Sequence, residues 1–244
     1  MNRQCVLRAR PTGVAQAADF ALVDAPLATL PHGHVRVQNR FLSVEPAMRG
    51  WIADTGNYAA PVAIGAVMRA LAAGIIIESR HGDYAVGDWV IGWFGWQEQA
   101  VVPPDAIVRR WTDADLSPSL GLGVLGINGV TAHLALTGIG QPRGGETIVI
   151  STAAGAVGSA VGQIATLLGC RAVGITGGAA KVRQCVQRYG YAAAVNYKDD
   201  GLAGALGAAC PDGVDIYFDN TARQISDTVY PLLNIGARVV VCGT

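Results

Sequence analysis

The chain has 244 residues, of which 51% are hydrophobic and 15% are charged, and its formal net charge is zero. A neutral chain with few charged residues lacks the electrostatic field that attracts nucleic acid or an anionic membrane surface, so we expect small, weakly charged or apolar partners. The length and the hydrophobic content are sufficient for two domains with substantial cores.

The sequence predicts neither a membrane span nor a secretion signal. No apolar run approaches the roughly 18 residues that a spanning helix needs, and the polar residues 1–4 do not begin a signal peptide. We therefore expect a cytoplasmic protein.

The cysteine and histidine positions argue against disulfide bonds and against a bound metal. The five cysteines are far apart in the sequence and never in CxxC spacing. His32 and His34 are explained more simply by a turn before a strand than by a pair of ligands. We expect no metal, and cysteines that pack as small hydrophobic residues.

The first half of the chain consists of short β segments broken by Gly, Pro and Asp. This pattern predicts an irregular β-barrel, which we assign to residues 1–125 as the substrate domain. The glycine-rich segment 120–129 is either a hinge or the first helix of the next domain. The predicted strands are 20–23, 35–37, 74–78, 89–91, 99–102 and 107–109.

The second half alternates helices with strands, which is typical of a doubly wound parallel sheet. We assign residues 126–244 to a Rossmann-type dinucleotide-binding domain, and we expect the chemistry in a cleft between the two domains. The predicted strands are 147–151, 171–176, 193–196, 214–218 and 238–242.

Residues 147–162, TIVISTAAGAVGSAVG, combine a strand, a tight turn and a helix start. In the GxGxxG frame, Ala153 replaces the first glycine, while Gly155 and Gly158 remain for close backbone approach and helix–strand packing. A helix beginning near Val157 directs its free N–H groups at a diphosphate. Glycine is frequent in this chain, so a purely structural turn gives the same spacing, but the surrounding strand–helix–strand pattern favours a dinucleotide site.

The residues after the second strand favour NADP over NAD. Residues 176–178 occupy the place where NAD sites usually have a carboxylate, and no Asp or Glu occurs between residues 147 and 198. A 2′-phosphate would meet cations there, foremost Lys181, just past the strand end. The alternative is that the cations are solvated charges on helix faces. The other cations of this stretch are Arg171, Arg183, Arg188 and Lys198.

Several segments resemble the medium-chain dehydrogenase/reductase superfamily, and within it the zinc-independent leukotriene B4 12-hydroxydehydrogenase/prostaglandin reductase branch of NADP-dependent oxidoreductases. The resemblance covers nearly the whole chain and implies a GroES-like β-barrel followed by a Rossmann sheet. It depends on the segments SVEPAMRG at 43–50, VGDWVIGWFGWQE at 86–98, LGVLGINGVTA at 122–132, residues 139–170, ACPDGVDIYFDN at 209–220 and LLNIGARVVVCG at 232–243.

The resemblance implies which residues bind the cofactor, NADP(H). They are Gly155, Ala156, Val157 and Gly158 at the pyrophosphate, Lys181 and Tyr197 at the 2′-phosphate, and Asn220, Cys242 and Gly243 on the nicotinamide side.

The resemblance also implies a reaction. Residues 64–74 lack the cysteine and the GHE-type segment of zinc-dependent relatives. The zinc-independent branch reduces a carbon–carbon double bond conjugated to a carbonyl, by hydride transfer to the β carbon, and the resulting oxyanion needs hydrogen-bond donors. NADPH:quinone oxidoreduction, or a truncated non-catalytic NADP-binding module, are the competing interpretations.

Three residues of the first domain match the substrate side of the family's site. Tyr58 matches a tyrosine that reaches the substrate, and its phenol can donate to the enolate because it titrates near ~10; packing beside Trp51 is the structural alternative. Met48 and Arg49 match a strand end beside the nicotinamide, where Met48 shapes the pocket wall and Arg49 either braces a loop or forms a structural ion pair.

The chain departs from the family at several positions. Ala47 replaces a tyrosine, Asn128 replaces a proline, and residues 221–223, Thr-Ala-Arg, replace a Val-Gly-Gly turn, so we expect a different substrate preference. The family runs on for roughly a third more length, beyond a typical single domain. We therefore expect a truncated sheet, and a missing edge for the homodimer that the family suggests.

Overall fold

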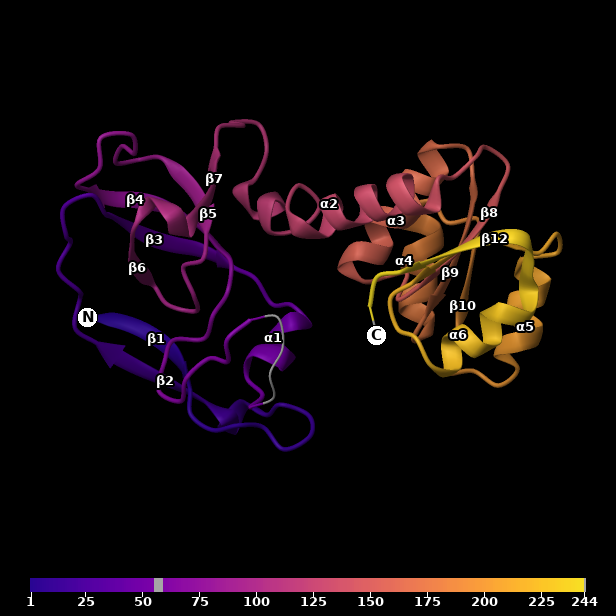
Figure 1. Cartoon of the computed structure of the whole chain (residues 1–244), viewed down its shortest axis with the longest axis horizontal. Coiled ribbons are helices and arrows are strands. Elements are labelled where there is room, and N and C mark those ends of the chain that lie inside the picture. The colour runs from indigo at the N-terminus through magenta and orange to yellow at the C-terminus, as the bar shows by residue number, and fades with distance from the viewer. Residues whose placement is uncertain (55–58, 244) are drawn as a thin grey trace. The chain divides into compact units, whose positions relative to one another are not determined.

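The structure is a computed structural model that describes residues 1–54 and 59–243. Its tertiary contacts divide the chain into two compact units, unit 1 (Met1–Leu122) and unit 2 (Gly123–Thr244) (Figure 1). Among the described residues, no helix has both the length and the apolar character that a membrane span requires.

Unit 1 is built from antiparallel strands. Five of them form a sheet in the order β6-β3-β4-β5-β7, and β1 pairs with β2 in a separate two-stranded sheet. Alternate residues of β3 point inward, so Val35 and Val37 pack with Ile76 and Phe94 in one buried cluster. The elements are β1 (Asn2–Leu7), β2 (Phe20–Ala25), β3 (Val35–Leu42), α1 (Ala47–Trp51), β4 (Ala72–Ser79), β5 (Trp89–Gly92), β6 (Gln99–Val102) and β7 (Ile107–Trp111).

Two elements of unit 1 differ from the sequence-based expectation. Strand β1 was not predicted because its first residues are polar, yet the Asn2 side chain is buried and its Nδ2 donates to Gln97 Oε1 at 3.1 Å and to the Gln99 carbonyl at 2.8 Å. Met48 and Arg49, expected at a strand end, lie instead in the one-turn helix α1, which begins directly after Pro46, whose φ of −57° and ψ of −33° suit a helix start.

Unit 2 is a five-stranded parallel sheet in the order β10-β9-β8-β11-β12, preceded by helix α2 and a π-helical segment, residues 135–140. The β-rich first unit and this sheet confirm the predicted fold class. The elements are α2 (Ile127–Leu134), β8 (Thr147–Ser151), α3 (Ala156–Leu167), β9 (Arg171–Thr176), α4 (Ala179–Tyr189), β10 (Ala193–Asn196), α5 (Leu202–Ala209), β11 (Val214–Asp219), α6 (Gln224–Val229) and β12 (Leu233–Val241).

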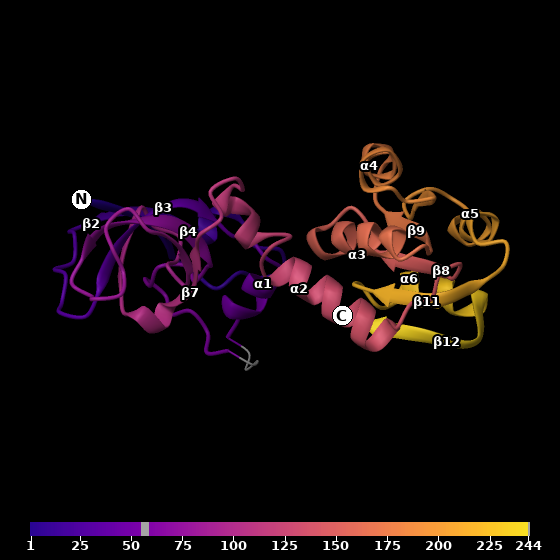
Figure 2. The same ribbon diagram turned by 90° about the horizontal axis from the view of Figure 1, so that it is seen from above.

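Helices cover both faces of this sheet (Figure 2). Ile148 and Ile150 of β8 point to the face covered by α2 and α3, whereas Val149 points to the face covered by α5 and α6. A strand buried on both faces is apolar at successive positions, which is why the sequence signal for β8 is a continuous run. Strand β12 is longer than the predicted 238–242 and begins at Leu233.

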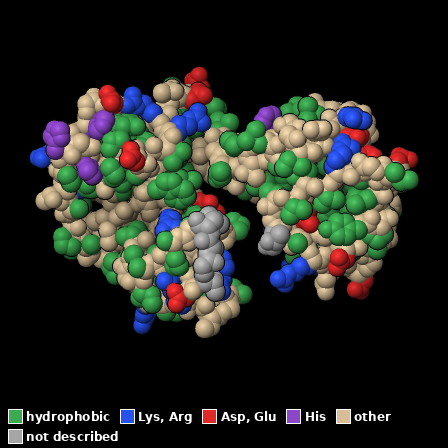
Figure 3. Space-filling view, viewed as in Figure 1, with side chains coloured by type: hydrophobic (Ala, Val, Ile, Leu, Met, Phe, Trp, Pro, Cys, Tyr) green, Lys and Arg blue, Asp and Glu red, His purple; other side chains and the backbone are tan. Residues whose placement is uncertain are grey.

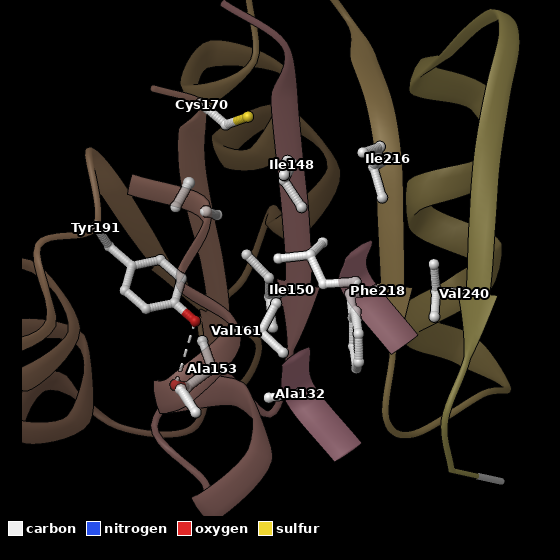
Figure 4. Packing of buried hydrophobic residues seen from close by; sticks show 14 of the residues in the cluster. Ala132, Ile148, Ile150, Ala153, Val161, Cys170, Tyr191, Ile216, Phe218 and Val240 are labelled. Atoms are coloured by element: carbon white, nitrogen blue, oxygen red, sulfur yellow. Dashed lines mark hydrogen bonds between the residues drawn. The ribbon is translucent and has the colours of Figure 1, made fainter. Parts of the chain in front are cut away.

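The side chain of Tyr191 packs between helix α3 and the sheet and stabilises their contact (Figure 4). Its ring lies where a Cβ atom on Gly162 would collide with it. Its hydroxyl donates to the carbonyl of Gly158 at 2.7 Å and to that of Ala153 at 3.4 Å. Burial raises the pKa of Tyr191 well above its usual value, so the phenol stays protonated and keeps these bonds.

Charged side chains of both signs are scattered among hydrophobic ones on the face of each unit that Figure 3 shows. This distribution agrees with the zero net charge of the chain. It offers no extended cationic surface on that face.

Candidate functional site

The turn between β8 and α3 requires glycine at two positions. A Cβ atom on Gly158 would collide with the carbonyl oxygen of Thr152 and lie 2.9 Å from the Cα of Ala153, and one on Gly155 would lie 2.7 Å from Thr152 Cγ2. Helix α3 begins at Ala156, with no side-chain cap among the described residues. Its first N–H groups are therefore available to an anion, as predicted for a phosphate cradle.

Ala153 occupies the first fingerprint position without disturbing the turn. It is fully buried, and its backbone N–H donates to the carbonyl of Ile175 at 3.0 Å. A Cβ atom on Gly174 would lie 2.7 Å from the Cβ of Ala153. The glycine on β9 thus makes room for the alanine in the turn, which explains how the fingerprint tolerates this replacement.

A cavity of about 190 Å³ lies where β8, β9, β10 and β11 end. This is the edge at which ligands collect in open parallel sheets. It brings together Lys181 and Tyr197, both predicted, with Lys198, one of the other cations named in that stretch. It adds Thr221 and Ile225, which the sequence did not indicate as site residues. The full lining is Thr152, Thr176, Gly177, Lys181, Tyr197, Lys198, Thr221 and Ile225.

The cavity is positively charged. None of its lining residues is acidic, and neither Lys181 nor Lys198 forms an ion pair with any residue that the structure describes. Lys198 Nζ lies 6.0 Å from the centre of the Tyr197 ring. Two unpaired ammonium groups beside a phenol are suited to a phosphoryl group. In the sequence, the position of Lys198 directly after Tyr197 is the feature that indicates a place for Lys198 in this site.

The ends of β9 and β10 are fixed to each other at this cavity. Asn196 Oδ1 accepts hydrogen bonds from the backbone N–H of Gly178 at 2.6 Å and of Lys198 at 3.2 Å. The N–H of Tyr197 donates to the carbonyl of Thr176 at 3.0 Å. These bonds hold the backbone that carries Tyr197 and Lys198 against the end of β9.

Asp219, at the end of β11, is a buried carboxylate that organises the following turn. Its Oδ2 accepts from Ser226 Oγ at 2.6 Å, and its Oδ1 accepts from the Tyr217 hydroxyl at 3.0 Å and from the N–H of Thr221 and Ala222 at 3.0 and 2.8 Å. Burial would raise the pKa of Asp219, but these hydrogen bonds outweigh it and hold the pKa below its usual value. Asp219 was not predicted, because its partners are defined only by the fold.

The turn after β11 keeps a backbone conformation that favours glycine, although it contains none. Ala222 and Arg223 have φ angles of +55° and +61°. Both φ angles lie in the left-handed region that favours glycine, so two residues with side chains hold this turn at a cost in strain. The hydrogen bond from the Ala222 N–H to Asp219 helps to hold it.

The predicted residues at the ends of β11 and β12 lie together. Asn220 donates from Nδ2 to the Ser151 carbonyl at 2.8 Å, and the N–H groups of Cys242 and Gly243 donate to the Asp219 carbonyl at 2.7 and 3.1 Å. A Cβ atom on Gly243 would lie 2.8 Å from the Asn220 carbonyl oxygen. Burial raises the pKa of the Cys242 thiol, which therefore stays protonated and unreactive near neutral pH.

The predicted residues of unit 1 have different surroundings. Met48 is 6% exposed and packs with Trp51 and Met68 in a hydrophobic cluster. Arg49 is exposed, and its Nη2 donates to the carbonyl of Gly13 at 3.0 Å, a bond that braces a loop. Tyr58 lies outside the described residues.

Within residues 1–54 and 59–243, no group of three or more His, Cys, Asp or Glu side chains is arranged to hold a metal ion. His34 Nδ1 lies 3.2 Å from the carbonyl of His32, within the turn that precedes β3.

The residues of unit 2 fit NADP(H). The glycine turn leaves no room for side chains at Gly155 and Gly158, and two lysines without carboxylate partners line the neighbouring cavity. Thr221 Oγ1, at the same cavity, is enclosed and has no hydrogen-bonding partner among the described residues. A backbone cradle, cations and an unpaired hydroxyl are the groups that a phosphorylated dinucleotide requires.

Two family models match the chain. One, described as the N-terminal domain of oxidoreductase, matches residues 3–109, and one described as zinc-binding dehydrogenase matches residues 156–244.

Individual proteins are similar over nearly the whole chain. The NADPH-dependent curcumin reductase of Escherichia coli (strain K12) is 43% identical over 99% of this chain and 70% of its own length. The NADP(+)-dependent 2-alkenal reductase of Nicotiana tabacum is 34% identical over 99% of this chain and 72% of its own length. Prostaglandin reductase 1 of Sus scrofa is 36% identical over 95% of this chain and 69% of its own length. Among solved structures, the crystal structure of CurA in complex with NADPH from Vibrio vulnificus matches this fold with a TM-score of 0.93 and 40% sequence identity. The match covers 99% of this chain and 71% of the CurA chain.

Proposed function

The chain belongs to the zinc-independent leukotriene B4 12-hydroxydehydrogenase/prostaglandin reductase branch of the medium-chain dehydrogenase/reductase superfamily, and from this premise we propose that it is an NADPH-dependent reductase of carbon–carbon double bonds in α,β-unsaturated aldehydes and ketones. The relatives are named for curcumin, 2-alkenals and prostaglandins, and their similarity extends over both units. The cofactor is NADP(H), as in the related CurA complex.

One observation supports this proposal most strongly. The glycine turn and the cationic cavity share Thr152, so a diphosphate at the turn and a 2′-phosphate at Lys181 belong to one continuous site. The cavity has no acidic lining residue that would favour the ribose of NAD. The site is therefore suited to NADPH over NADH.

We assign roles to the chain's own residues as follows. Residues 155–158 bind the diphosphate through backbone N–H groups, and Lys181 with Tyr197 binds the 2′-phosphate. Asn220, Cys242 and Gly243 line the nicotinamide side, as a group at the ends of β11 and β12. When bound, NADPH supplies the hydride for the β carbon of the substrate.

The substrate side is assigned to unit 1. Tyr58 donates a hydrogen bond from its phenol to the carbonyl oxygen of the substrate, where negative charge collects during reduction. Met48 and Arg49 shape the substrate pocket, Met48 through its core packing and Arg49 through its bond to the loop at Gly13. We place the substrate domain at residues 1–125 and the cofactor domain at 126–244. A cytoplasmic location and a homodimer stay predictions.

The test is an assay of purified protein with NADPH and a panel of alkenals, cyclic enones, curcumin, quinones and saturated aldehydes. We expect NADPH oxidation with the enals and enones, and mass spectrometry should show a product that has gained two hydrogens and kept its carbonyl. A saturated aldehyde of equal chain length is the matched control and should not react. Turnover of quinones alone, or NADPH binding without any turnover, would contradict the proposal.

A further inference from the structure

Thr221 lines the cationic cavity of unit 2 but has an unused polar group. Its hydroxyl oxygen is enclosed and has no hydrogen-bonding partner among the described residues. Enclosing a hydroxyl without a partner is unfavourable, because its bonds to water are lost and not replaced. A valine has almost the same shape and carries no such penalty. The threonine hydroxyl therefore indicates a partner that is present only when the cavity is filled.

The backbone of Thr221 is fixed, so only its side chain can change. Its N–H donates to Asp219 Oδ1 at 3.0 Å, and the preceding N–H, of Asn220, donates to Ser151 Oγ at 2.7 Å. Rotation about the Cα–Cβ bond is the remaining freedom, and it exchanges the hydroxyl and the methyl group among staggered positions.

The position of Thr221 in the cavity tells which part of a ligand it meets. Tyr197 and Lys198 follow β10, and Lys181 follows β9, whereas Thr221 follows β11 on the other side of β8. Thr221 nevertheless lines the same cavity as both lysines. A phosphoryl group held by the lysines has its own sugar and base as the nearest parts of the ligand, and these carry the hydrogen-bond donors and acceptors that the Thr221 hydroxyl can meet.

We propose that the Thr221 hydroxyl forms a hydrogen bond with the adenosine half of NADP(H), at a point other than the 2′-phosphate. This inference rests on the proposed cofactor. It makes Thr221 a binding residue that strengthens the affinity for NADPH and for NADH alike, in contrast to Lys181, which acts only where the 2′-phosphate is present.

The test compares Thr221→Val with Thr221→Ser by isothermal titration calorimetry. The ligands are NADPH, NADH and 2′,5′-ADP, which contains the phosphorylated adenosine alone. We expect Thr221→Val to raise the dissociation constant of all three by about 3- to 10-fold, the usual worth of one neutral hydrogen bond, and Thr221→Ser to keep most of the affinity. The thermal midpoint of the ligand-free Val variant should not fall, which separates lost binding from lost folding.

Lys181→Ala is the matched control, because it should weaken NADPH and 2′,5′-ADP binding and spare NADH. Unchanged dissociation constants in Thr221→Val would overturn the assignment of Thr221 and leave the proposed cofactor in place. A loss for NADPH without a loss for 2′,5′-ADP would also overturn it, since the hydroxyl would then act on the other half of the cofactor. Absence of NADPH binding by the unaltered protein would overturn the proposed function as well.

Discussion

Unit 2 gathers its candidate site residues at the ends of parallel strands, whereas the candidate residues of unit 1 lie on a one-turn helix and the segment after it. In a parallel sheet every strand ends at the same edge, so Thr152, Thr176, Tyr197 and Thr221 meet although they are far apart in the sequence. In the antiparallel sheet of unit 1, neighbouring strands end at opposite edges. A motif therefore locates a site in unit 2 but not in unit 1.

The candidate residues of the two units also differ in how much they contribute to ligand binding and to folding stability. The cationic side chains of unit 2's cavity have no ion-pair partners among the described residues, so they are free to bind a ligand and contribute little to folding. Met48 of unit 1 is packed in a hydrophobic core, and Arg49 is bonded to a loop carbonyl. All five tryptophans, residues 51, 89, 93, 96 and 111, belong to unit 1, so their fluorescence reports its unfolding separately.

The largest expected effect is on the stability of unit 1. Met68 is fully buried in the same cluster as Met48, and Met68→Ala leaves a cavity that should cost about 2–5 kcal/mol. The tryptophan transition in urea should move to lower concentration, while the dissociation constant for NADPH, measured below that transition, stays unchanged. If Met68→Ala also weakened NADPH binding, the claim that the core of unit 1 is independent of the cofactor site in unit 2 would be wrong.

Next in size is the loss of cofactor discrimination in unit 2. Lys181→Ala removes a charge-assisted contact to the 2′-phosphate, so NADPH should bind about 10- to 100-fold more weakly while NADH is little affected. Lys198→Ala should act in the same direction. Calorimetric titrations of both cofactors measure the ratio, and the tryptophan transition serves as the control. Equal losses for NADPH and NADH would contradict the assignment.

A smaller effect is expected where helix α3 meets the turn. Gly158→Ala forces its new methyl group against the Thr152 carbonyl, so unit 2 should lose about 1–3 kcal/mol of stability together with NADPH affinity. Gly204→Ala, in helix α5, is the matched control, because an added Cβ meets nothing within 4 Å. That change should stabilise unit 2 by about 0.5–1 kcal/mol. Circular dichroism follows both variants, and similar midpoints for the two would refute the close contact.

The smallest expected difference is in the response to acid. The carboxyl groups whose pKa the structure lowers are, among the described residues, Glu146 and Asp219, both in unit 2. The pKa of Glu146 is lowered mainly by the hydrogen bonds that Arg238 donates to its carboxylate, at 2.6 and 2.9 Å. A group with a lower pKa in the folded state stabilises fully above its unfolded pKa of about 4, and this stabilisation is lost as the pH falls toward the folded value.

Unit 2 should accordingly unfold before unit 1 as the pH is lowered below about 4. The measurement is an acid titration followed by circular dichroism and by tryptophan emission on the same sample. In Asp219→Asn the first transition should depend less on pH. Coincident transitions by both probes, in the unaltered protein, would show that the units do not differ in this respect.

Much of the fold was predictable, because hydrophobic patterns and turn residues act locally. Strands β8, β9 and β10 have the predicted bounds, since each is an apolar run between glycine or polar turns. Strand β1 was missed because its buried Asn2 finds its partners about 95 residues away, at Gln97 and Gln99. Patterns along the chain cannot reveal such pairing.

The candidate site was predictable only in part, for a similar reason. Lys181 and Tyr197 were expected at the 2′-phosphate, and the structure places both at one cavity. The role of Asp219 depends on Ser226 and on the N–H groups of the following turn, which the sequence does not bring together. The unpaired hydroxyl of Thr221 is visible only once its surroundings are known. Tyr58 lies outside the described residues, and its role stays a prediction.

The most direct test of the account is the binding of two small ligands to the unaltered protein. Isothermal titration calorimetry with 2′,5′-ADP and with 5′-AMP isolates the contribution of the 2′-phosphate from the rest of the cofactor. The account predicts that 2′,5′-ADP binds at least about tenfold more tightly, as expected for a charge-assisted contact, and that Lys181→Ala combined with Lys198→Ala removes the difference. Equal affinities for the two ligands in the unaltered protein would contradict the central claim that the end of unit 2's sheet recognises NADP(H).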